Sequence, residues 1–140
     1  MPLSAEDIIN ACEAEWEAHK DDCSGFVKAV AARLQIPLHG LANDIVATIS
    51  QPPWLRLADG VQAERAAADG RFVVAGMRGS DQAKPAEHGH VVVVVKGELD
   101  RRGLYPPAYW GRLGNVGDKN KTLNFAWNPQ DRDRITYATM

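Results

Sequence analysis

A cysteine and a histidine in this sequence have the residue types and the placement that nucleophilic catalysis requires. Cys23 lies at the start of an expected helix, on the same helical face as Val27, Val30 and Leu34. A helix N-terminus carries a partial positive charge and unpaired N–H groups, which favour a thiolate and can bind a developing oxyanion. We therefore interpret Cys23 as a candidate nucleophile, although a thiol that only fills the core would show the same pattern.

His90 is the candidate base for this nucleophile. It opens the apolar run 91–95, which is typical of a central strand buried on both faces. Because we expect its side chain to point towards the packed helix, the sulfur of Cys23 and the imidazole of His90 should lie within hydrogen-bond reach. The alternative at this position is a histidine that merely caps the end of a strand.

His88 raises a different chemistry. It lies two residues before His90 and shares its face if the strand extends that far, so His88, His90 and Cys23 form an alternative metal site. No fourth ligand occurs at a recognisable spacing. We therefore expect no metal ion and no other cofactor.

The first half of the chain has a helical pattern. Apolar residues at helical spacing predict a first helix over 8–16, and Ser4 with Asp7 resembles a capping box in front of it. The second helix should begin at Cys23, behind Asp21 and Asp22, and end at the break before Pro37. Two further helices are expected at 41–49 and 60–68.

The second half of the chain has the pattern of strands. Short β-branched or aromatic runs separated by turn residues predict strands at 72–75, 91–95, 108–112, 124–127 and 134–138, with a turn-rich stretch at 114–121. Helices followed by strands indicate an α+β fold. The length of 140 residues is typical of one domain, so we expect residues 1–140 to form a single core.

Composition excludes several classes of protein. The hydrophobic content of 45% and the charged content of 24% are those of a folded globular domain. A net charge of -2 without a basic run argues against nucleic acid as a partner. The apolar run 91–95 is far shorter than the roughly 20 residues of a membrane span, and the acidic, amphipathic N-terminus does not resemble a secretory signal.

Two cysteines leave one disulfide possible in principle. We expect none, because a domain of this length needs no covalent link and the surroundings of Cys23 are those of a reactive thiol. Cys12 is interpreted as a small buried hydrophobic residue.

Two motifs together resemble the NlpC/P60 signature: Asp22-Cys23-Ser24-Gly25-Phe26-Val27 and, further on, Gly89-His90-Val91. The resemblance implies a papain-like fold, with N-terminal helices packed on an antiparallel sheet and the nucleophile at a helix N-terminus. It also implies that Cys23 is the nucleophile and His90 the general base. For the oxyanion we expect the backbone N–H of Cys23 and a nearby donor, either the side chain or the backbone of Asp22, with Ser24 in a supporting position.

One feature of the NlpC/P60 pattern is missing. Many of these enzymes orient the histidine with a third polar side chain on the next strand, but residues 105–111 include no His, Asn or Asp. We therefore expect a backbone carbonyl near Tyr109 or Trp110, or a water molecule, to hold the imidazole, and a catalytic dyad rather than a triad.

A closer resemblance covers nearly the whole chain. It is to the first family of type VI secretion amidase effectors, and its segments are 9–12, 21–37, 72–79, 105–106, 127–128 and 131–134. Members of that family are toxins injected into the periplasm of rival bacteria, where they hydrolyse the D-glutamate to meso-diaminopimelate bond of peptidoglycan stem peptides. The resemblance implies a cognate immunity protein, passage through the secretion tube and synthesis without a signal peptide. We expect a monomer.

An anionic stem peptide should meet basic side chains, and candidate loops carry Arg78, Lys84, Arg112, Lys119 and Lys121, most of which we expect to be ordinary solvated charges. Arg78, Tyr109 and Trp110 are the side chains expected in the cleft. The alternative functions are a housekeeping cell-wall hydrolase, a papain-like acyltransferase and a non-catalytic binding protein whose cysteine and histidine only pack.

Overall fold

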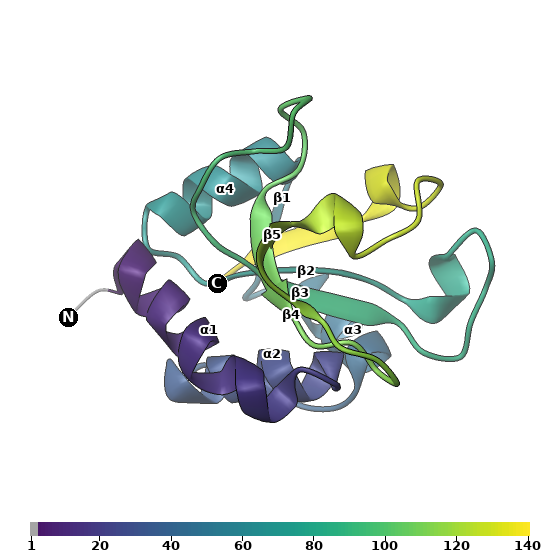
Figure 1. Cartoon of the computed structure of the whole chain (residues 1–140), viewed down its shortest axis with the longest axis horizontal. Coiled ribbons are helices and arrows are strands. Elements are labelled where there is room, and N and C mark those ends of the chain that lie inside the picture. Colours follow the sequence, from purple (N-terminus) through teal and green to yellow (C-terminus); the bar gives the residue numbers. More distant parts are fainter. Residues whose placement is uncertain (1–2) are drawn as a thin grey trace.

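A six-stranded antiparallel sheet forms the centre of the molecule, with three helices on one face and one on the other (Figure 1). The structure is a computed structural model and describes residues 3–140. The helices are α1 (Ala5–His19), α2 (Cys23–Arg33), α3 (Ala42–Ile49) and α4 (Gly60–Ala68). The strands are β1 (Leu55–Leu57), β2 (Val73–Met77), β3 (His90–Val94), β4 (Pro107–Trp110), β5 (Asp118–Thr122) and β6 (Thr136–Thr139).

The sheet has the order β1-β6-β2-β3-β4-β5, so β2 and β3 lie at its centre. All paired strands are antiparallel, and the β2–β3 register places Met77 opposite His90. Residues 3–140 also include three short 3₁₀ helices: η1 (Gly79–Asp81), η2 (Leu123–Phe125) and η3 (Arg132–Arg134). The α+β class and the antiparallel sheet expected from the sequence are confirmed.

Alternation along β3 divides the core into two clusters. Val91, Val93 and Val95 pack with α1, α2 and α3, whereas Val92 and Val94 pack with α4 and the chain around η2. Successive side chains of a strand point to opposite faces, so each face of this strand contributes to a different cluster. Cys12 and Cys23 both belong to the first cluster, as free thiols, and Cys12 is fully buried there.

The helices agree closely with those expected from the sequence because their caps are visible in it. Ser4 and Asp7 form the capping box of α1, with Asp7 N–H donating to Ser4 Oγ at 3.1 Å and Ser4 N–H to Asp7 Oδ2 at 2.8 Å. Asp59 caps α4 by accepting from Gln62 N–H at 2.9 Å.

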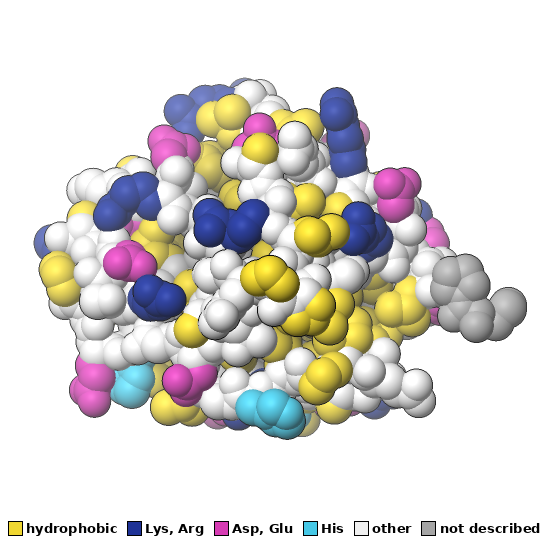
Figure 2. Space-filling model, turned by 180° about the vertical axis from the view of Figure 1, so that it is seen from behind, with side chains coloured by type: hydrophobic (Ala, Val, Ile, Leu, Met, Phe, Trp, Pro, Cys, Tyr) yellow, Lys and Arg dark blue, Asp and Glu magenta, His cyan; other side chains and the backbone are white. Residues whose placement is uncertain are grey.

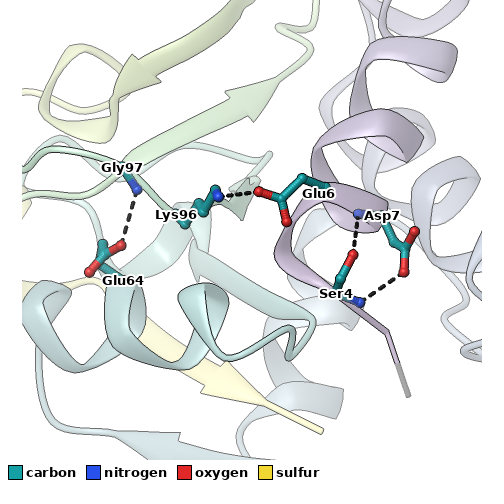
Figure 3. Close-up of polar contacts among 6 residues, drawn as sticks. All are labelled: Ser4, Glu6, Asp7, Glu64, Lys96 and Gly97. Atoms are coloured by element: carbon teal, nitrogen blue, oxygen red, sulfur yellow. Dashed lines mark hydrogen bonds and ion pairs between the residues drawn. The ribbon is translucent and has the colours of Figure 1, made fainter. Parts of the chain in front are cut away.

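The start of α1 is also tied to the far end of β3. The carboxylate of Glu6 pairs with Lys96, and the carboxylate of Glu64 on α4 accepts from Gly97 N–H at 3.0 Å (Figure 3). These contacts join α1 and α4 through the loop that follows β3. They lie beyond the C-terminal end of β3, whereas His90 lies at its N-terminal end.

The prediction of a strand at 124–127 is wrong, because this segment overlaps η2 and the turn that follows it. Leu123, Ala126 and Trp127 are buried while Phe125 is exposed, a spacing of three and four that fits a helical turn rather than alternation. The sequence analysis also missed β1 and β5. Both are edge strands, and the polar β5 lies within the stretch interpreted as turns.

The surface mixes charges of both signs. On the face shown in Figure 2, hydrophobic side chains gather near the middle, with Lys, Arg, Asp and Glu side chains interspersed around them. Among the helices of residues 3–140, none has both the length and the apolar character needed to cross a lipid bilayer.

Replacing Val27 by Ala should test the contact between α2 and the sheet. Val27 is completely buried in the first cluster, so the loss of two methyl groups and the resulting cavity should lower the free energy of unfolding by about 2 kcal/mol. Urea denaturation measures the change. Val116→Ala is the matched control, because Val116 is 53% exposed, and an equal loss in the two variants would contradict this account of the core.

Candidate active site

The first turn of α2 presents Cys23 to the sheet. Asp22 is the N-cap, and its carboxylate accepts from Gly25 N–H at 3.1 Å and from Ser24 Oγ–H at 3.3 Å. Cys23 follows as the first helical residue and is only 6% exposed. The expected placement of Cys23 at a helix N-terminus is confirmed. Because the Asp22 carboxylate is an acceptor in both contacts, it has no proton to donate to an oxyanion.

The turn before α2 is held against the end of β4. Lys20 O accepts from Arg112 N–H at 3.0 Å and from Gly117 N–H at 2.8 Å. A Cβ atom on Gly111 would lie 2.2 Å from His19 O and 2.6 Å from Asp22 O, so only glycine allows this approach. The close contact fixes the height of Cys23 above the sheet.

The sulfur of Cys23 lies beside the backbone at the start of β3. Gly89 O lies 4.0 Å from Sγ. Burial raises the pKa of the Cys23 thiol, and the charge of Asp22 also raises it. Backbone N–H groups, with that of Val91 first among them, lower the pKa but do not outweigh burial. Burial therefore works against the expected thiolate, since the pKa of the thiol lies above its ordinary value.

A groove of about 420 Å³ opens next to this sulfur. It lies between the start of α2, the start of α3 and the segment before β3, and its lining includes Cys23, Asn43 and His88. Leu41 and Leu113 also line it and are 58% and 57% exposed. Exposed leucines on the rim of a groove that contains a thiol suit a ligand with apolar as well as polar parts.

His90 faces the other side of the sheet. It pairs with Met77 and alternates with Val91, and its ring packs edge-on against Trp127 with ring centroids 5.1 Å apart. Met77 and Trp127 belong to the second cluster, whereas Cys23 belongs to the first. Within residues 3–140, no hydrogen bond joins the side chains of Cys23 and His90, so their pairing stays a prediction. The sulfur lies near the backbone on either side of His90, at Gly89 O and Val91 N–H.

The imidazole of His90 has an unusual environment. The residue is partly exposed as a whole, but Nε2 is buried and has no hydrogen-bond partner. Burial, assisted by the positive charge of Arg112, lowers the pKa of His90 from 6.5 to about 3. The ring is therefore neutral at physiological pH, which is the form that a general base requires.

A second cavity, of about 240 Å³, lies beside His90. Its lining comprises Gln82, His90, Arg112, Phe125, Ala126, Trp127, Asn128 and Asp131. Arg112 Nη2 donates to Phe125 O at 3.3 Å, which holds its guanidinium over this side of the sheet. The structure thus separates the two predicted catalytic residues into two cavities.

The remaining residues expected in the cleft do not lie there. Tyr109 and Trp110 are almost completely buried, and Trp110 O accepts from Trp16 Nε1–H at 3.1 Å instead of holding the imidazole. Arg78 is exposed and lines neither cavity. Lys119 pairs with Glu13 at 2.9 Å. Of the basic candidates, Arg112 alone lines one of the two cavities.

The structure adds residues that the sequence analysis did not assign to a site. Leu41, Asn43 and Leu113 line the thiol groove, and Trp127 and Asp131 line the second cavity. Trp127 and Asp131 lie in segments that carry the resemblance to the amidase effectors, which is the one signal that pointed to them. Within residues 3–140, no three His, Cys, Asp or Glu side chains form a group that could hold a metal ion.

The low pKa of His90 predicts a dependence of stability on pH. The folded state disfavours the imidazolium, so the unfolded state binds the proton more readily below pH 6.5, and stability falls as the pH drops from 6.5 towards 3. This one group should cost up to about 1.4 kcal/mol per pH unit in that window. His90→Gln should flatten the profile measured by urea denaturation, whereas His39→Gln, at an exposed histidine, serves as the control. Identical profiles for the wild type and His90→Gln would refute the assignment.

Asp22→Asn should make Cys23 more reactive. The amide oxygen can still cap α2, but the negative charge that raises the pKa of the thiol is removed. Unit charges about 4 Å apart interact by about 1 kcal/mol even in a water-like dielectric, so alkylation of Cys23 by iodoacetamide should accelerate a few-fold at neutral pH. Peptide mapping measures the rate, with Asp21→Asn as the control. An unchanged or slower rate in Asp22→Asn would contradict the electrostatic argument.

Comparison with known proteins identifies the family. No protein-family model matches the chain. The peptidoglycan amidase Tse1 of Pseudomonas aeruginosa is 40% identical to it over 141 residues, which cover 93% of this chain and 86% of Tse1. This similarity confirms the predicted resemblance to the amidase effectors. The chain belongs to the family of the peptidoglycan amidase Tse1.

Proposed function

We propose that this protein is a peptidoglycan amidase that uses Cys23 as its nucleophile and His90 as its general base. The observation that carries the proposal is the 40% identity to the amidase Tse1 across almost the entire chain. The position of Cys23 supports it, because a buried thiol in the first turn of a helix opens onto a groove. The proposal includes a single domain with the papain-like NlpC/P60 fold.

The proposed substrate is the amide bond between D-glutamate and meso-diaminopimelate in the stem peptide. This assignment rests on the resemblance to the amidase effector family. The groove beside Cys23 is compatible with it, because its rim offers Leu41 and Leu113 to aliphatic parts and Asn43 to polar parts of a peptide. Delivery through a type VI system into the periplasm of a target cell, and a cognate immunity protein that covers the groove, belong to the same proposal.

In the proposed mechanism, His90 accepts the thiol proton while the sulfur attacks the amide carbonyl carbon. Backbone N–H groups of Cys23 and Ser24, which already lower the pKa of the thiol, stabilise the oxyanion. The imidazolium then protonates the leaving amine and a thioester remains. Water, deprotonated by the same imidazole, hydrolyses the thioester, which restores the thiol and releases the carboxylic acid.

This mechanism requires the imidazole to move from its position against Trp127 towards the sulfur. Two features favour such a movement. Nε2 makes no hydrogen bond that would have to break, and the residue before His90 is Gly89, at the very start of the strand. The separation of the two side chains also favours a second candidate, a binding protein without catalytic activity. The two candidates differ in their effect on peptidoglycan.

Digestion of purified sacculi distinguishes them. The wild type should release fragments that mass spectrometry identifies as cleaved between D-glutamate and meso-diaminopimelate, and Cys23→Ala should be at least about 10³-fold slower because nucleophile and base act as a unit. His90→Ala should lose a comparable factor. Cys12→Ala is the matched control, since Cys12 is buried away from the groove.

Each result bears on a separate part of the proposal. Unchanged muropeptides after incubation with the wild type would support the binding protein and reject the amidase. Full activity in Cys23→Ala would reject the nucleophile. Full activity in His90→Ala would reject the base while leaving the amidase in place.

A further inference from the structure

The cavity beside His90 contains buried polar groups that the proposed chemistry does not use. His90 Nε2 and Trp127 Nε1 are buried without a hydrogen-bond partner, and both residues line this cavity. Native structures pair the large majority of buried side-chain polar atoms, so two unpaired groups in one wall require an explanation. Both nitrogens are closed to a water-sized probe, so a ligand with acceptor oxygens would pair Trp127 Nε1 once that ring turns towards the cavity.

The charges around the cavity are unbalanced. Three charged or titratable groups line it: Arg112, Asp131 and His90. Asp131 is already satisfied, because its Oδ1 accepts from Arg134 Nη2 and from Ala83 N–H, both at 2.8 Å. Within residues 3–140, the guanidinium of Arg112 has no carboxylate within salt-bridge distance and donates to the backbone carbonyl of Phe125. A guanidinium without a carboxylate partner therefore lines the same cavity as two rings with unpaired nitrogens.

We propose that this cavity is a carboxylate-binding subsite of the amidase, in which Arg112 pairs with a free carboxylate of the substrate and Trp127 Nε1 hydrogen-bonds the same group. This inference rests on the proposed function and extends it to the recognition of the substrate. Guanidinium and carboxylate form the strongest type of side-chain ion pair, because two parallel N–H donors match two oxygens. The volume of about 240 Å³ is about eight times that of a water molecule in the liquid, enough for one amino-acid-sized group.

Residues adjacent in the chain line the two cavities. Gly89 and Leu113 line the thiol groove, whereas their chain neighbours His90 and Arg112 line the second cavity. The two short segments 89–90 and 112–113 thus stand between the cavities. A stem peptide is branched and has several carboxylates, so one arm can lie beside the sulfur while a carboxylate of another arm reaches Arg112.

Occupation of the subsite also bears on the base. The positive charge of Arg112 helps to lower the pKa of His90, and a bound carboxylate would offset that charge. The only other charged lining group, Asp131, is already paired with Arg134. The imidazole should therefore become a stronger base when the substrate is bound.

Binding to a catalytically inactive protein tests the subsite. Cys23→Ala is titrated with the tripeptide L-Ala-γ-D-Glu-meso-diaminopimelate and, separately, with the same peptide whose free carboxylates are amidated. The indole ¹H–¹⁵N signal of Trp127, assigned with Trp127→Phe, reports binding. The acidic peptide should shift this signal saturably, and adding Arg112→Gln should weaken binding by about tenfold or more. Arg56→Gln, at an exposed arginine of β1, should leave binding unchanged.

Two results would overturn the inference: equal affinity for the acidic and the amidated peptide, or an affinity that Arg112→Gln leaves unchanged. Arg112→Lys guards against a folding defect, because it keeps the positive charge and should bind more tightly than Arg112→Gln. Sacculus digestion separates this inference from the proposed function. Full digestion by Arg112→Gln together with unweakened binding would reject the subsite and leave the amidase intact, whereas binding through Arg112 without any digestion by the wild type would reject the amidase alone.

Discussion

The contact between the first turn of α2 and the backbone at the start of β3 determines the properties of both candidate catalytic residues. The cap at Asp22, the close approach at Gly111 and the bonds to Lys20 O all hold this turn down on the sheet. Because the turn lies so close, the sulfur of Cys23 contacts main-chain atoms of the strand rather than a side chain. The same contact buries the sulfur, and burial decides its protonation.

Burial favours the neutral form of both the thiol and the imidazole. Each side chain is more stable neutral in a low-dielectric environment, so burial raises the pKa of Cys23 and lowers that of His90. The helix N-terminus and the N–H groups around the sulfur oppose this effect but do not reverse it. A neutral imidazole can accept a proton from a neutral thiol, so these directions agree with the proposed roles of His90 and Cys23. In the proposed subsite, a bound carboxylate would also offset the charge of Arg112.

The parts of the fold that the sequence predicts are those with a strong local signal. The caps at Ser4 and Asp22 and the apolar run 91–95 mark the helices and the central strand, and the structure places them as expected. Edge strands have no such signal, because a strand exposed to solvent needs no apolar face, and β5 is therefore polar like a loop. The segment of η2 has apolar residues but too few to reveal their period.

The candidate site was harder to predict from the sequence than the fold. The sequence identifies Cys23 and His90 by type and places each at the start of its element, but the face to which a strand residue points depends on register, and a shift of one residue reverses it. Here Met77 opposite His90 and the packing of Val91 against α2 set that register. The imidazole therefore lies on the far face, where Arg112 and Trp127 come from segments distant in the chain. Only the tertiary structure brings these residues together. The ring of His90 is held by packing rather than by a hydrogen bond at Nε2, because it contacts Trp127 edge-on. In the proposed role of His90 as the base, this contact takes the place of the missing third polar side chain.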